Sequence, residues 1–96
     1  MKLFPEYLNK GSKGPAVMLL QVILLTLGCN GAIVADGEYG EMTAVGVREL
    51  QKRLGFAEAE CDGNFGPVTR EAFRLTYSLE VNALKADLFV GETVVV

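Results

Sequence analysis

Two aspartates, Asp36 and Asp62, each open a nearly identical stretch of the chain. A pair of carboxylates is what a glycoside hydrolase uses, one as the acid and the other as the nucleophile or base. Here each aspartate precedes a glycine, and an Asp-Gly pair is explained by turn formation alone. The chain has no histidine and no tryptophan, and no nucleophile–base pair stands at a known spacing. We therefore expect that the chain is not an enzyme and that its turns bind a ligand or stabilise the fold.

The turn sequence is repeated. Residues 36–43 (DGEYGEMT) recur 26 positions later as residues 62–69 (DGNFGPVT), with Asp, Gly, an aromatic residue, Gly and Thr in register. A fixed period of this size marks a repeated supersecondary unit. Gly11 and Gly14 form a fainter copy before the pair, and residues 87–93 form a degenerate one after it.

Each residue type in the turn has a physical use. Asp supplies an acceptor and the next Gly adopts positive φ, while the second Gly leads the chain into a helix. The aromatic residue is expected to fill the gap beneath the turn, and the Thr hydroxyl to bond nearby backbone. We expect both turns to converge at one end of the helices and form a shallow cleft for a polar ligand.

Three helices are predicted to position these turns. The first runs from Pro15 to about Leu27, the second from Glu41 to Leu54 and the third from Pro67 to about Leu79, and Gly28 and Gly55 stop the first two. Val47, Leu50 and Leu54 form an apolar stripe on the second helix, where Gly46 is expected to allow close approach of another helix. Residues 1–14, 32–35 and 88–96 read as loops or short strands. The expected fold is mainly α: one domain over residues 1–96, a compact three-helix bundle with short strands or extended segments at the termini.

Composition narrows the function classes. Half of the 96 residues are hydrophobic, so a core can form, and the net charge of −3 with a pI near 4.9 argues against nucleic-acid binding, which needs a basic patch. Cys29 and Cys61 read as small apolar residues, although a disulfide stays open. Two cysteines without histidine are too few ligands for zinc, so no metal or cofactor is expected. The apolar run 17–27 is too short to span a bilayer and makes an unconvincing signal peptide.

The ordered set of motifs resembles the peptidoglycan-binding domain family, the small three-helix modules attached to cell-wall hydrolases. Residues 11–17 with Leu20-Gln21 look like its first helix, residues 36–43 with Leu50-Gln51 like its second, and residues 62–69 with Ala72 like its third. The resemblance covers residues 8–79. It implies the bundle fold, a cell-wall or extracytoplasmic location (a phage-borne protein being possible) and a peptidoglycan or muropeptide ligand bound without catalysis.

Candidate ligand-binding residues follow from the resemblance by position: Asp36, Gly37, Tyr39, Gly40, Thr43, Asp62, Gly63, Phe65, Gly66 and Thr69. Arg48 and Gln51 are added because they could meet peptide carboxylates. The alternative for Gln21 and Gln51 is that they tie a helix to a loop inside the fold. The third helix departs from the family pattern at Thr76-Tyr77.

The first helix also departs from the family pattern, because it is apolar on every side. Met18, Leu19, Val22 and Leu25 stand where polar residues are expected, which predicts burial against a partner. That partner is a second copy, a catalytic domain or residues 80–96 of this chain folded back. Two functions therefore compete: a wall-binding module that targets an attached or associated hydrolase, and an interaction or structural module of a phage or secretion particle, with the first helix as its interface.

Overall fold

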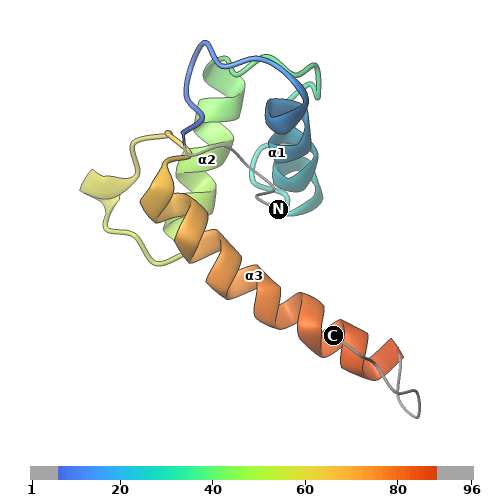
Figure 1. The fold of residues 1–96 in the computed structure, drawn as a ribbon. Helices are drawn as coiled ribbons and strands as arrows, with labels where there is room; N and C mark the ends of the chain where they lie inside the picture. The colour runs from blue at the N-terminus through green and yellow to red at the C-terminus, as the bar shows by residue number, and fades with distance from the viewer. Residues whose placement is uncertain (1–6, 89–96) are drawn as a thin grey trace.

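Within the residues that the structure describes, the regular structure consists of three α-helices and one short 3-10 helix (Figure 1). The computed structural model describes residues 7–88, with side chains as far as Tyr77. The elements are α1 (Pro15–Thr26), α2 (Glu41–Arg53), η1 (Glu58–Glu60) and α3 (Pro67–Leu88). The prediction of a mainly α fold with three helices is confirmed, and no strand forms within residues 7–88.

The predicted stop signals end the first two helices. Gly28 and Gly55 follow the C-caps Leu27 and Leu54 with φ of 71° and 92°, a left-handed conformation that glycine adopts without the steric cost of a β-carbon. Pro15 opens α1 at a position where its missing N–H is not needed. Local sequence chemistry therefore sets these boundaries within a residue of the prediction.

Two predicted features of the secondary structure are wrong. Helix α3 does not end near Leu79 but continues to Leu88, because no glycine or proline interrupts the chain between Pro67 and Gly91. Residues 32–35 form a loop instead of a strand, since the bonds there are local ones such as Asp36 N to Val34 O. The strand predicted within residues 88–96 lies almost wholly outside the described residues.

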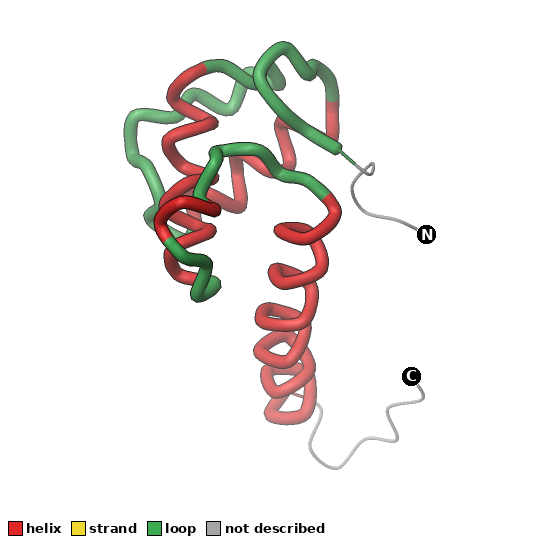
Figure 2. The backbone as a smooth tube through the Cα atoms, turned by 90° about the vertical axis from the view of Figure 1, so that its left-hand side faces the viewer, coloured by secondary structure: helices red, strands yellow, loops and turns green. Residues whose placement is uncertain are grey.

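The N-terminal segment is extended and joins both turns to the body. Leu8 forms an isolated antiparallel bridge with Phe65, and Lys13 forms another with Glu38. Figure 2 shows this segment as loop running across the helices. One short segment thus holds the two repeated turns on the same side of the molecule.

The core lies between α1, α2 and the aromatic residues of the turns. Val17, Leu20 and Leu24 of α1 are buried together with Val47 and Leu50 of α2, and Tyr39 and Phe65 close the core from the turns. The prediction that these aromatic residues fill the space beneath each turn is confirmed.

Gly46 allows the predicted close approach. A β-carbon placed there would lie 2.7 Å from Cδ1 of Ile33 and 3.2 Å from Cδ1 of Leu24. Leu24 belongs to α1 and Ile33 to the loop after it, so α2 seats against both.

Helix α3 joins the core through aromatic rings. Phe73 meets Phe65 edge to face at 6.0 Å between ring centroids, and Tyr77 stacks at a tilt on Phe73 at 4.9 Å. Beyond this contact the helix runs clear of α1 and α2 in both views (Figures 1 and 2). The prediction that residues 80–96 fold back over α1 is therefore wrong for residues 80–88, because their helix leads away from α1. Residues 89–96 lie outside the described residues.

Candidate functional site

The first turn is held by a buried glutamine of the preceding helix. Nε2 of Gln21 lies 2.8 Å from the carbonyl oxygen of Glu38, 3.0 Å from Oγ1 of Thr43 and 3.3 Å from Oδ1 of Asp36, and donates to these acceptors. Its Oε1 accepts from the N–H of Gly37 at 2.9 Å. Both ends of one amide therefore bond to the turn.

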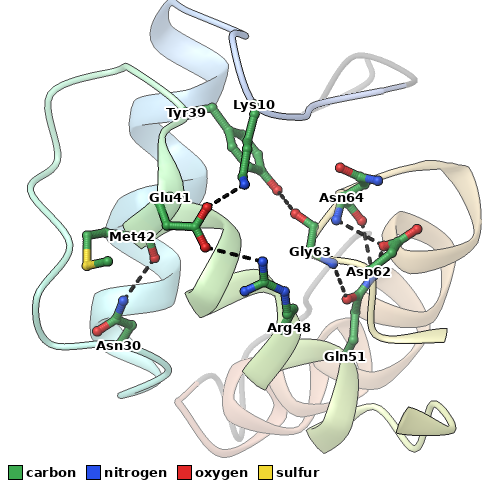
Figure 3. Close-up of polar contacts among 10 residues, drawn as sticks. All are labelled: Lys10, Asn30, Tyr39, Glu41, Met42, Arg48, Gln51, Asp62, Gly63 and Asn64. Atoms are coloured by element: carbon green, nitrogen blue, oxygen red, sulfur yellow. Dashed lines mark hydrogen bonds and ion pairs between the residues drawn. The ribbon is translucent and has the colours of Figure 1, made fainter. Parts of the chain in front are cut away.

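The second turn is held in the same way by α2. Nε2 of Gln51 lies 3.0 Å from Oδ1 of Asp62, 3.0 Å from Oγ1 of Thr69 and 3.1 Å from the carbonyl oxygen of Asn64. Its Oε1 accepts from the N–H of Gly63 at 3.0 Å, a contact drawn in Figure 3. The structure thus bears out the view that the glutamines tie helix to loop. The Thr hydroxyls, expected to bond backbone, instead accept from these glutamines.

Both aspartates also bond within their own turns. Oδ1 of Asp36 accepts from the N–H of Glu38 at 2.9 Å, and Oδ1 of Asp62 from the N–H of Asn64 at 3.0 Å. The Glu38 N–H and then Gln21 lower the pKa of Asp36, while Gln51 and then the Asn64 N–H lower that of Asp62. Both carboxylates are therefore ionised at neutral pH, which suits acceptors in a turn better than a proton donor.

The two turns meet through one side chain. The buried Tyr39 donates from its hydroxyl to the carbonyl oxygen of Gly63 at 2.5 Å, so the aromatic residue of the first turn bonds to the glycine of the second (Figure 3). Burial raises the pKa of the Tyr39 hydroxyl, and the proton needed for this bond stays in place. Gly63 itself packs closely against α2. A β-carbon placed on Gly63 would lie 3.0 Å from the carbonyl oxygen of Ala44.

Among the described residues, a hollow lies beside the second turn. This hollow has a volume of about 370 Å³, and its lining includes Gln51, Asp62, Gly66 and Thr69 from the predicted set. The remaining lining residues are Tyr7, Phe56, Glu60, Asn64, Pro67 and Val68. No residue of the first turn lines this hollow, and Tyr39 and Phe65 are core residues.

Besides Gln51, three side chains of the hollow lie outside the repeated motif. Tyr7 precedes the first helix, Phe56 precedes the short 3-10 helix η1, and Glu60 is the last residue of η1. The sequence reading missed them because no motif includes them. An aromatic residue left outside the apolar stripes, such as the half-exposed Tyr7, is the signal that could have pointed to them.

Arg48 takes part in a separate ion cluster on the other side of Gly63. Glu41 contacts Nζ of Lys10 through one carboxylate oxygen, and its other oxygen lies 3.4 Å from Nη2 of Arg48 (Figure 3). Lys10 and then Arg48 lower the pKa of Glu41. Arg48 is therefore already paired with a carboxylate of its own chain.

The apolar face predicted on the first helix is divided between core and surface. Leu19 and Leu25 are partly buried and pack against the core, whereas Met18 and Val22 stay 44% and 46% exposed. The cysteines are not joined: Cys29 is buried in the core and Sγ of Cys61 lies 3.4 Å from the Ala57 carbonyl oxygen.

Fold and turns together define a small three-helix module in which a glutamine of each of the first two helices fixes the Asp-Gly turn that leads into the next helix. The family model described as "Putative peptidoglycan binding domain" matches residues 13–58. The resemblance to the peptidoglycan-binding domain family is confirmed over these residues. No curated protein and no solved structure shows significant similarity to the chain. Among the helices of residues 7–88, none is long and apolar enough to cross a membrane.

Proposed function

We propose that this chain is a non-catalytic module that binds peptidoglycan through the hollow beside the second turn. The family match makes the cell wall the expected partner, and the observation that carries the proposal is the hollow itself. Its lining combines polar residues of the second turn with two aromatic residues, Tyr7 and Phe56. Pockets with apolar walls and a few fixed polar groups are typical of small-ligand sites.

The internal bonds of the turns narrow the set of contact residues. Both glutamine amides and both threonine hydroxyls already bond within the fold, and Gly37 bonds to Gln21. Ligand contact is therefore assigned to atoms at the rim of the hollow, above all Asp62, Asn64 and the segment from Gly66 to Val68. The first turn then serves to position the second, through the Tyr39–Gly63 bond.

A binding module of this kind raises the local concentration of the protein that it accompanies. Attached to or associated with a wall hydrolase, it would hold that enzyme at its substrate and raise the effective concentration there. Location at the cell wall and the absence of catalysis both belong to this proposal. Incubation with purified sacculi should accordingly release no soluble muropeptides above a buffer control.

The test blocks the hollow without touching the turns. Val68 is 73% exposed at the rim, so Val68→Trp should place an indole across the mouth and weaken co-sedimentation with sacculi by about tenfold, a change of about 1.4 kcal/mol. Val34 is 69% exposed in the loop after α1 and does not line the hollow, which makes Val34→Trp the matched control. Equal binding by both variants would place the wall contact elsewhere. An Asp36→Ala or Asp62→Ala variant is a poorer test, because it removes bonds that hold a turn.

One observation favours the second candidate, an assembly module that pairs with another copy through α1. Met18 and Val22 remain exposed on the helix that the sequence singled out. Leu19 and Leu25 pack inward, so the free apolar face is narrower than predicted. Failure of the wild-type protein to bind sacculi, together with a concentration-dependent dimer in light scattering, would favour assembly over wall binding.

A further inference from the structure

The hollow beside the second turn combines aromatic walls with unneutralised negative charge. Glu60 and Asp62 line it, and among the residues whose side chains are described no lysine or arginine does. Within residues 7–77 neither carboxylate forms an ion pair. The partners of Asp62 are amides, and the partner of Glu60 is the N–H of Ala57 at 3.4 Å.

The acidic side chains of the first turn, in contrast, form ion pairs. Glu41 lies between Lys10 and Arg48, and Glu38 pairs with Lys13 at 3.6 Å. Figure 3 shows the contrast: Lys10 and Arg48 contact Glu41, whereas the contacts drawn for Asp62 are with amide groups of Gln51 and Asn64. The negative charge at the hollow is thus a local feature and does not follow from the net charge alone.

We propose that this hollow receives a primary ammonium group on an alkyl chain, namely the free side-chain amine of a diamino acid in a peptidoglycan stem peptide. The inference rests on the proposed function and names the group recognised at that site. The ammonium donates hydrogen bonds to Glu60 and to the free edge of the Asp62 carboxylate. Its alkyl chain packs against Tyr7 and Phe56, whose ring faces also attract a cation.

The same features disfavour other wall groups. Carboxylates and phosphates would meet two negative charges without a compensating cation, and like charges at short range repel. An N-acetylated sugar could pack against the rings but would leave both carboxylates without a charged partner.

The test removes the positive charge from the wall and, separately, the negative charge from the hollow. Co-sedimentation is measured with native sacculi and with sacculi whose free amines have been acetylated, using the whole chain. Acetylation should weaken wild-type binding by about fivefold, the size expected for one partly exposed charge contact on an aromatic rim. Glu60→Gln should bind native sacculi about fivefold more weakly and should no longer distinguish the two preparations.

Glu58→Gln is the matched control. It makes the same change of charge in the same 3-10 helix, and Glu58 does not line the hollow. Thermal melting of both variants checks that the fold is retained. If Glu58→Gln loses as much binding as Glu60→Gln, overall charge and not the hollow is responsible, and the assignment fails.

The failures of the two proposals are distinguishable. Wild-type binding that is equal on native and acetylated sacculi overturns the ammonium assignment and leaves wall binding intact. Wild-type protein that binds neither preparation overturns the proposed function itself.

Discussion

At the scale of single residues, the two glutamines determine how the turns are built. Gln21 and Gln51 are almost completely buried. In each, the amide nitrogen donates to acceptors of the turn, and the amide oxygen accepts from a glycine N–H. A buried polar group is tolerated only when it is bonded, and here the turn supplies every partner. The glutamines are therefore structural residues, and Gln51 also lines the candidate ligand site.

Gln51→Ala should destabilise the protein by about 2–4 kcal/mol, because it leaves the buried Gly63 N–H without an acceptor and opens a cavity beneath the turn. The measurement is urea unfolding followed by circular dichroism. Lys52→Ala, one residue further along the same helix at an exposed position, should change stability by less than about 0.5 kcal/mol. A Gln51→Ala effect as small as that of Lys52→Ala would show that the amide does not hold the turn.

At the scale of elements, α2 contacts both α1 and the second turn and so connects the parts of the fold. It packs on α1 through Gly46 and carries Gln51, and Arg53 near its end donates to the Leu27 and Gly28 carbonyl oxygens that finish α1. These contacts use opposite ends and faces of one thirteen-residue helix. The spacing of α1 and α2 then depends on the small size of the residue at position 46.

Gly46→Ala should lower stability by roughly 1 kcal/mol. The gain in helix propensity is about 1 kcal/mol, but overpacking against Cδ1 of Ile33 costs about 1–3 kcal/mol. Ile33→Val removes that atom, so in its background Gly46→Ala should become neutral or stabilising. The four proteins form a double-mutant cycle measured by thermal unfolding, and simple additivity of the two changes would contradict the proposed contact.

At the scale of the whole molecule, two similar units share one core and touch through their turns. The family model ends at residue 58, before the second turn begins, yet the second glutamine and turn repeat the bonds of the first. The hydroxyl of Tyr39 is the link between them, and α3 continues from the second unit past the body of the molecule (Figure 1). The two units should therefore unfold together.

Tyr39→Phe should cost about 1–2 kcal/mol at neutral pH, because the buried Gly63 carbonyl oxygen loses its donor. The difference should depend on pH in a known direction. Burial raises the pKa of Tyr39 in the folded state, so above the unfolded value of about 10 the unfolded chain releases the proton first and the wild type loses stability. Tyr39→Phe lacks this loss, and the two stabilities should approach each other in urea unfolding between pH 9 and about 11. A constant difference across that range would contradict a buried, protonated Tyr39.

The sequence by itself determined the features that depend on neighbouring residues. Helix starts and stops, positive φ at the Asp-Gly turns and burial of the turn aromatics follow from backbone sterics and apolar spacing, which act over a few positions. Gly46 also predicted a close packing contact, because a glycine inside a helix lowers helix propensity and is expected where another element approaches closely. The family resemblance rested on the same local signals.

Only the tertiary structure decided which polar atoms remain available to a ligand. Gln21 lies 15 residues from Asp36, whereas Gln51 lies 11 from Asp62, so no fixed spacing reveals that both perform the same task. The hollow likewise gathers Tyr7, Phe56 and Glu60 from separate segments, and residues 32–35 became a loop because no strand lies beside them. Hydrogen-bond capacity and surface shape depend on partners that are distant along the chain, and only folding brings those partners together.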